Sequence, residues 1–273
     1  MQQLRLAILS NAGGSGKTTL ATHLTYLLSI AKYSVATIDL DPQGSINVFC
    51  GLPRPDESQT IAAVLSNDKF SGDWPIVPLW NNKGVKSAYA CQGEKILEKT
   101  SNELVLHQRG AYLLGDRLDD FPLKQDVIIF DCPATLGPLP TIAITAATHI
   151  LVPVQVEPKS TAGASKLLEW LYEKFGILRL NPRPKILGFV PNQYDRKIAI
   201  HRTLLEQLSP MLSELGIHCF NPIRSSSEFK NACALGLPLQ LYRPSHPACK
   251  DFNPIIKALK NELNQGEKLW AAG

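Results

Sequence analysis

The chain has 273 residues, of which 44% are hydrophobic, so it can bury a substantial core as one large or two small α/β domains. No apolar run approaches the roughly 18 residues of a membrane span, and no charged-then-apolar leader opens the chain. We therefore expect neither a transmembrane helix nor a signal peptide.

Charge and cysteine content narrow the class further. The formal net charge is +4, and the final third is basic, with 12 lysines and arginines against 7 acidic residues in positions 181–273. Such a basic part of the chain indicates one of two things. It binds an anionic partner such as DNA or acidic lipid, or it is simply a solvated basic face. The six cysteines include no C-x-x-C pair. This pattern favours free thiols in the reduced cytoplasm over disulfides or a zinc site.

Strand and helix signals alternate along the chain. Short apolar runs predict strands, and amphipathic runs predict helices between or after them. Alternation of this kind predicts a single α/β domain over 1–273, with a doubly wound, mostly parallel sheet flanked by helices. Residues 66–100, rich in proline, glycine and asparagine, are interpreted as loop and excursion. The predicted strands are 4–10, 35–39, 127–131, 150–154 and 186–190, and the named helices are 17–31, 198–215, 226–235 and 252–264.

A glycine-rich loop joins the first strand to the first helix. Residues 10–19 read SNAGGSGKTT, whose end, GKTT, is that of a phosphate-binding loop, although Asn11 stands where the strict pattern has glycine. Glycines let the backbone N–H groups face phosphate oxygens, and the helix N-terminus adds its positive dipole end. We expect a nucleoside triphosphate to bind Gly13, Gly14, Ser15, Gly16, Lys17, Thr18 and Thr19.

Two acidic segments follow buried strands at the same expected edge of the sheet. Asp39 and Asp41 lie in IDLDPQGS, and Asp131 lies in VIIFDCPATLG. Asp131 is well placed to hold the Mg²⁺ shell through water, and Asp41 to orient or deprotonate a water for attack on the γ-phosphate.

These segments, together with ILVPVQVEP, resemble in order the deviant Walker-box ATPases typified by ParA and MinD. The resemblance runs from about residue 4 to 260 and is weakest over 66–110. It implies a P-loop NTPase fold, an ATP-bound sandwich dimer, and slow ATP hydrolysis that a partner stimulates. By motif it implies that Lys17 and Asp41 are catalytic, that Thr18, Asp39 and Asp131 surround Mg²⁺, and that Asn192 and Pro222 flank adenine.

One position departs from this family. Most members carry a lysine where this chain has Ala12, and that lysine reaches the phosphates of the other subunit. A buried polyanion demands paired charge, so we hypothesise that Lys159, after the 150–154 strand, supplies it across the dimer interface. The alternative is that the protein functions without this lysine. In lacking this lysine the chain resembles the McdA branch of the family, which positions carboxysomes on the nucleoid with the adaptor McdB. A plasmid or chromosome partition ParA with a ParB-like adaptor remains an alternative.

The resemblance also implies non-specific DNA binding by the basic final third, in a cytoplasmic, nucleoid-associated protein. Charge neutralisation of phosphates needs clustered lysines and arginines, and no base-reading motif is present. The candidate contacts are Arg202, Arg224, Lys230, Arg243, Lys250, Lys257 and Lys260, with Arg224 and Lys230 foremost.

Two other readings stay open at this point. A MinD-like protein would place the amphipathic segment 252–264, followed by Leu269 and Trp270, on a membrane, although such a stripe more often faces a core. A nitrogenase-type iron protein would use Cys91 and Cys132 to hold a cluster between subunits, although the glycine-flanked contexts expected for such ligands are absent.

Overall fold

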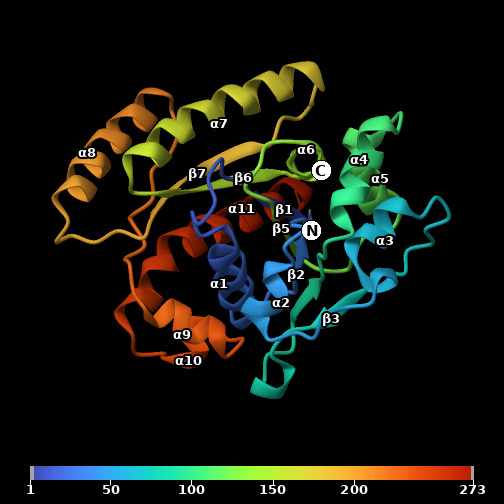
Figure 1. The fold of residues 1–273 in the computed structure, drawn as a ribbon, viewed down its shortest axis with the longest axis horizontal. Coiled ribbons are helices and arrows are strands. Elements are labelled where there is room, and N and C mark those ends of the chain that lie inside the picture. Colours follow the sequence, from blue (N-terminus) through green and yellow to red (C-terminus); the bar gives the residue numbers. More distant parts are fainter. Residues whose placement is uncertain (1–2, 272–273) are drawn as a thin grey trace.

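A twisted seven-stranded sheet organises the chain (Figure 1). The computed structural model describes residues 3–271 and, within them, the side chains outside 160–162 and 266–271. The strand order is β3-β4-β2-β5-β1-β6-β7; β3 is antiparallel to β4, and the other neighbouring pairs are parallel. The strands are β1 (Leu4–Ile8), β2 (Val35–Asp39), β3 (Ile76–Pro78), β4 (Ala88–Cys91), β5 (Val127–Asp131), β6 (His149–Gln155) and β7 (Lys185–Asn192).

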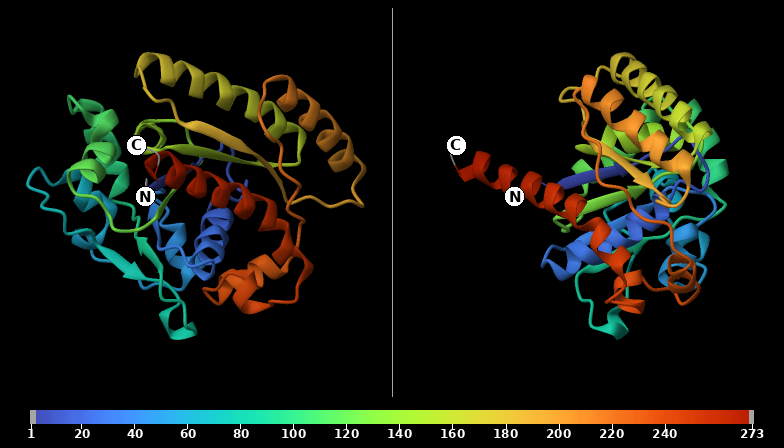
Figure 2. Two further views of the ribbon diagram at one scale, coloured as in Figure 1. Left: turned by 180° about the vertical axis from the view of Figure 1, so that it is seen from behind. Right: turned by 90° about the vertical axis from the view of Figure 1, so that its left-hand side faces the viewer.

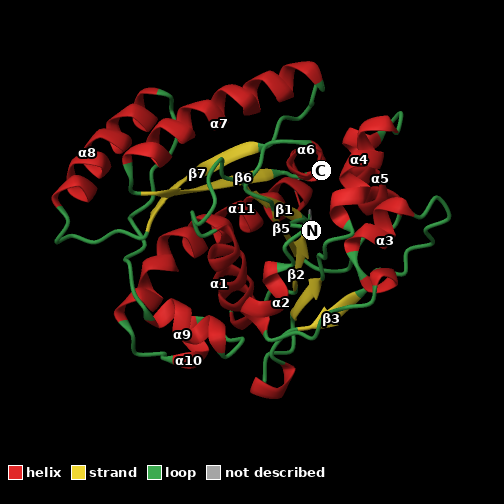
Figure 3. Cartoon of the chain, viewed as in Figure 1, coloured by secondary structure: helices red, strands yellow, loops and turns green. Residues whose placement is uncertain are grey.

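Helices cover both faces of the sheet, and Figure 3 shows the strands passing between α1 on one side and α7 on the other. The described α-helices are α1 (Lys17–Ile30), α2 (Ser45–Cys50), α3 (Ile61–Ser66), α4 (Leu97–Leu106), α5 (Leu113–Asp120), α6 (Pro138–Ala146), α7 (Pro158–Ile177), α8 (Ala199–Glu214), α9 (Glu228–Ala234), α10 (Leu239–Tyr242) and α11 (Asn253–Ala271). Short 3-10 helices are η1 (Glu57–Gln59), η2 (Asn81–Lys83), η3 (Gly110–Tyr112) and η4 (Pro247–Phe252).

Two hydrophobic cores follow from the alternation of side chains along each strand. On β1, Leu6 and Ile8 point into the core formed with α1, α2 and α11, whereas Ala7 points into the core formed with α3 to α8. Strands buried on both faces must be apolar nearly throughout, which is why VIIF in β5 contains no alternating polar positions. The doubly wound fold expected from the sequence is confirmed.

The segment 66–100 differs from its interpretation as loop and excursion. It contains β3 and β4, which extend the sheet beyond β2. The sequence hides them because β3 is three residues long and ends at Pro78, and because β4 reads AYAC, in which alanine is a weak strand former. This part of the chain therefore forms one edge of the sheet, with β4 parallel to β2 and β3 antiparallel to β4.

The apolar stripe of the last helical segment faces the core. Phe252, Ile255 and Leu259 are fully buried and Leu263 is nearly so, all in the core that α1 shares. Figure 2 shows α11 crossing one face of the molecule with its last turns projecting beyond it. These apolar side chains are buried and so cannot lie on a membrane, as the MinD-like alternative required. The side chains of Leu269 and Trp270 lie outside the described ones. Among the described helices, none combines the length and the apolar character that a bilayer crossing requires.

A buried histidine ties α1 to the C-terminal helices. The His23 Nδ1–H donates to the Thr19 carbonyl at 2.6 Å, and Nε2 accepts from the Leu239 backbone N–H at 3.1 Å. Its ring stacks on Phe252, with centroids 4.7 Å apart and planes at 4°. Burial lowers the pKa of His23 to about 4, so the ring is neutral near pH 7.

Candidate nucleotide site

The phosphate-binding loop lies between β1 and α1, as predicted. Gly14 and Gly16 have φ values of 74° and 93°, the left-handed region that favours glycine, and Gly16 caps α1. A Cβ at Gly16 would also overlap the Asn192 side-chain amide. These two glycines direct the loop backbone around the start of α1, where N–H groups and the helix dipole favour an anion.

The end of β7 supports this loop from outside. Asn192 Nδ2 donates to the Ser15 carbonyl at 2.8 Å, and Gln193 Nε2 donates to the Gly14 carbonyl. Asn192 is thus in contact with the phosphate loop, and Pro222 is half-buried close by, since the Ile223 N–H donates to the carbonyl of Pro191. Their role at adenine remains a prediction. Gln193 was not singled out, because nothing in the sequence shows that β7 ends beside the loop.

Two buried carboxylates stand side by side at the carboxyl edge of the sheet. Asp39 and Asp131 pair in register across β2 and β5, and both are fully buried. Asp39 is already hydrogen-bonded, because Oδ1 accepts from the Asp41 N–H at 3.0 Å and Oδ2 from the Ile46 N–H at 3.1 Å. Burial, followed by the charge of Asp131, raises the pKa of Asp39. These two hydrogen bonds fix the turn after β2, and the expected contact of Asp39 with Mg²⁺ remains a prediction.

Asp131 carries the unused acceptors of the site. Neither of its oxygens has a hydrogen-bond partner of good geometry among the described residues. Burial raises the pKa of Asp131 to about 7, while the nearby Thr18 hydroxyl and Lys17 ammonium oppose that rise. A buried carboxylate without partners is costly unless a cation completes it. Oxygen donors are what Mg²⁺ prefers, so Asp131 and Thr18 fit the metal.

Lys17 points into the loop. It is only 7% exposed, and its Nζ donates to the Ala12 carbonyl at 3.3 Å. Burial lowers its pKa, whereas the charge of Asp131 raises it. An ammonium held inside the loop in this way lies where the phosphates of a bound nucleotide would meet it.

Asp41 keeps an open side. Its Oδ1 accepts from the Gln43 N–H at 3.0 Å, and the residue is half-buried. It lines a depression of about 500 Å³ that also contains residues 133–135 of the loop after β5. There is room here for a water molecule beside the carboxylate, as its expected role requires.

Lys159 shares a depression with the loop position that lacks a lysine. It lies in the first turn of α7 and is exposed. A cation there is disfavoured by the helix dipole. A depression of about 470 Å³ has Asn11, Ala12 and Gly13 on one side and Lys159 on the other. The fold thus brings Lys159 to Ala12, and its contact with a second subunit remains a prediction.

The predicted DNA-binding residues do not form one group. Arg202 is on α8, where it donates to the Arg196 carbonyl. A separate cluster around α9, α10 and η4 contains Arg224, Lys230, Arg243 and Lys250. Lys257 and Lys260 are on α11. Arg224 donates twice to Asp251, each time at 2.7 Å, and Arg243 pairs with Glu228 at 3.0 Å. These two arginines therefore hold the cluster together. Lys230, Lys250 and Lys257 are exposed and without ion pairs among the described side chains.

The iron-protein reading is wrong. Cys91 and Cys132 are fully buried in the core between the sheet and α3 to α8. Burial raises the pKa of both thiols. A cluster shared between subunits needs thiolates at the surface where the subunits meet, and these two sulfurs do not reach it.

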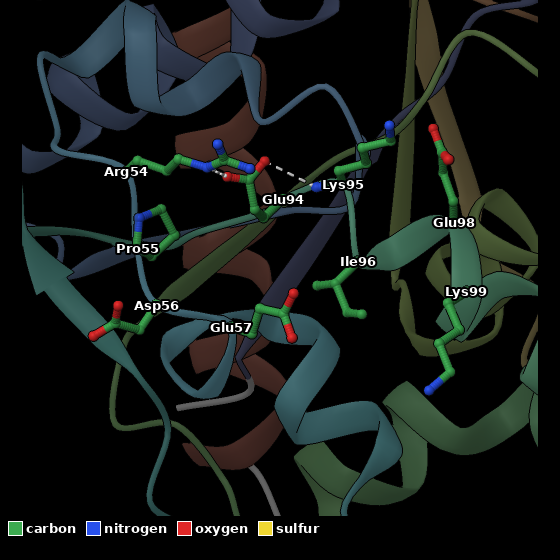
Figure 4. Close-up of a pocket in the computed structure, with 9 residues that line it drawn as sticks. All are labelled: Arg54, Pro55, Asp56, Glu57, Glu94, Lys95, Ile96, Glu98 and Lys99. Carbon is green, nitrogen blue, oxygen red and sulfur yellow. Dashed lines mark hydrogen bonds and ion pairs between the residues drawn. The ribbon is translucent and has the colours of Figure 1, made fainter.

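A larger polar depression, of about 620 Å³, lies between residues 54–57 and 94–99 (Figure 4). Arg54 pairs with Glu94 across it, and Glu57 and Ile96 point into it. None of its lining residues comes from the phosphate loop or from a strand end that carries Asp39 or Asp131. It is therefore separate from the nucleotide site.

The loop, Lys17 and the unpartnered Asp131 at the carboxyl edge of a parallel sheet define a nucleoside-triphosphate-binding α/β protein. A family model described as AAA domain matches residues 4–178. The chain belongs to this family, and it is an ATPase of the ParA/MinD type.

Relatives and solved structures agree with this assignment. The chromosome partitioning protein ParA of Myxococcus xanthus is 28% identical over 257 residues, which cover 93% of this chain and 87% of that protein. The fold is similar to that of a substituted McdA from Cyanothece in complex with ATP, with a TM-score of 0.83 at 23% identity over 94% of this chain and 96% of the other. It is also similar to the cell division ATPase MinD of Pyrococcus furiosus, with a TM-score of 0.73 at 20% identity over 96% and 99% of the two chains.

Proposed function

We propose that the chain is a positioning ATPase. In this proposal it closes as an ATP-bound homodimer, binds nucleoid DNA without sequence preference, and positions a cargo through an adaptor that stimulates hydrolysis. The observation that carries the proposal is the buried Asp131 carboxylate beside Thr18 and Lys17, whose oxygens have no hydrogen-bond partner of good geometry among the described residues, with Asp41 lining a depression at the same edge.

The roles of the residues follow from their positions. Lys17 would contact the phosphates from inside the loop, and Thr18 with Asp131 would hold Mg²⁺, which neutralises charge that develops on the phosphates. Asp41 would orient a water at the open depression. Lys159 would meet the phosphates of the second subunit. The positive end of the helix dipole disfavours a cation in the first turn of α7, and an anion from the other subunit would compensate for this.

The absence of a lysine at Ala12 bears on which cargo the protein positions. Ala12 and the likeness in fold to McdA favour a carboxysome-positioning protein with an McdB-like adaptor. The relatedness to ParA of Myxococcus xanthus supports the second candidate, partition of a plasmid or chromosome with a ParB-like adaptor. Both candidates share the DNA-bound dimer in the cytoplasm, so the first experiment addresses that step.

Binding to random duplex DNA, measured with ATP and with ADP at two salt concentrations, tests the proposal. ATP alone should switch on binding that weakens steeply with salt. Lys159→Ala should abolish the switch, whereas Lys174→Ala, on the same helix but lining a different depression, should keep it. DNA binding that ignores nucleotide would contradict the proposal, and lipid vesicles would then test the MinD-like alternative.

If Lys159→Ala still binds DNA in an ATP-dependent manner, the positioning function stands. In that case the assignment of Lys159 to the missing lysine is wrong.

A further inference from the structure

The depression beside Ala12 contains a second lysine, Lys166. It follows Lys159 by seven residues, about two helical turns, so both lie on one face of α7. Lys166 is exposed and has no ion pair among the described side chains. The acidic residue of this lining, Glu157, accepts a hydrogen bond from Gln155 at 2.6 Å. The face therefore carries more positive than negative charge.

This face shares only Gly13 with the loop residues that are expected to bind the chain's own nucleotide. The lining of the depression includes neither Lys17 nor Thr18 nor Asp131. Lys17 donates to the Ala12 carbonyl at 3.3 Å and is not among the residues that line this depression. An anion that meets Lys159 and Lys166 must therefore approach from outside the subunit.

Gly163 lies between the two lysines in the sequence, and nothing among the described residues requires it to be glycine. Its φ is not positive, and a Cβ there would meet nothing within 4 Å. Glycine inside a helix lowers stability relative to alanine, so the bare position needs another explanation. Glycine is the usual solution where another molecule must approach a backbone closely.

We propose that Lys166 is a second phosphate-binding residue of the closed dimer. Together with Lys159 it forms a face on α7 that receives the nucleotide held by the second copy, and Gly163 leaves room for that approach. The charge missing at Ala12 is thereby divided between two side chains. This inference rests on the ATP-dependent dimer of the proposed function.

Dimerisation by analytical ultracentrifugation with a non-hydrolysable ATP analogue tests the role of Lys166. Lys166→Ala should weaken the dimer by about tenfold or more, the effect of one charge-assisted contact, and Lys166→Arg should restore it. Lys174→Ala should dimerise normally. Binding of a fluorescent ATP analogue to the monomer should be unchanged in Lys166→Ala, because the chain's own nucleotide does not touch this residue.

Gly163→Leu tests the room for approach independently of charge. A Cβ at this position meets nothing within 4 Å among the described atoms, and leucine is a better helix former than glycine, so we expect a melting temperature near that of the wild type while the dimer is lost. A Gly163→Leu protein that dimerises normally would overturn the role of Gly163, and a Lys166→Ala protein that does so would overturn the role of Lys166. A wild-type chain that stays monomeric with the analogue would instead overturn the proposed function itself.

Discussion

Single backbone positions decide whether the phosphate loop can form. Gly16 combines a left-handed φ with close contact to Asn192, whose amide holds the Ser15 carbonyl. Gly13, three residues earlier, has neither feature, since a Cβ there would meet nothing within 4 Å and its φ is not positive. The two glycines therefore have different roles that the motif alone does not separate.

Gly16→Ala should lower the free energy of unfolding by about 1–3 kcal/mol even without nucleotide, because alanine is strained at this φ. Gly13→Ala should change it by no more than about 0.5 kcal/mol. Urea unfolding of the nucleotide-free proteins measures both. Equal effects of the two substitutions would mean that the contact with Asn192 does not shape the loop.

Asp41 is expected to act on hydrolysis and not on binding. Asp41→Asn keeps the acceptor for the Gln43 N–H but removes the charge, so the rate of ATP hydrolysis should fall by about 100-fold or more. Nucleotide affinity should stay near that of the wild type. Asp56→Asn, in the separate depression of Figure 4, is the matched control and should hydrolyse ATP normally. An unchanged rate in Asp41→Asn would remove this residue from the mechanism.

At the scale of elements, α1 links the nucleotide site to the C-terminal helices. Its first turn belongs to the phosphate loop, and His23, one and a half turns later, bonds to α10 and stacks on η4. The link depends on a neutral ring, because the Nε2 atom must accept from Leu239.

This link makes stability depend on pH. The pKa of His23 is about 4 in the fold and about 6.5 in the unfolded chain, so the unfolded state takes up its proton first as pH falls. The contribution is fully present above pH 6.5 and is lost between pH 6.5 and 4, by about 3 kcal/mol. Urea unfolding across this range should show the extra loss in the wild type but not in His23→Gln. Parallel curves for the two proteins would contradict the assignment.

Much of this site could be predicted from the sequence because its chemistry follows buried strands. The sequence runs before Asp39 and Asp131 are apolar enough to be strands. The phosphate-loop motif between β1 and α1 directly identifies the positions that are expected to bind nucleotide. The proximity of Lys166 and Gly163 to the loop could not be predicted, since it depends on where α7 packs in the fold. The edge strands β3 and β4 escaped because alanine, cysteine and proline carry little strand signal.

At the scale of the whole molecule, some basic residues are held in ion pairs within the fold, and others are exposed and could contact DNA. Arg224 and Arg243 are paired within the cluster of α9, α10 and η4, whereas Lys230 and Lys250 on the same cluster are exposed. Net charge in the sequence does not reveal this division, because it depends on which acids fold beside which bases.

Lys230→Ala and Lys250→Ala should each weaken ATP-dependent DNA binding equally across sequences and reduce its salt slope by about one. Lys83→Ala, an exposed lysine on η2, should leave both quantities unchanged. Arg224→Ala should instead lower thermal stability, because it leaves the nearly buried Asp251 carboxylate unpaired. Salt titrations of DNA affinity and melting curves separate these effects. Unchanged binding by both lysine variants would place the DNA surface elsewhere.

The burial of Phe252, Ile255 and Leu259 has a consequence for any attempt to dissect the protein. The family match ends at residue 178, yet β7 pairs along β6, and η4 and α11 cover α1 beyond that point. A fragment cut there would present an unpaired strand edge and a bare apolar helix together, the two features that most promote aggregation. The nucleotide-binding half is thus no portable module, and a tag or fusion must leave the C-terminal third in place.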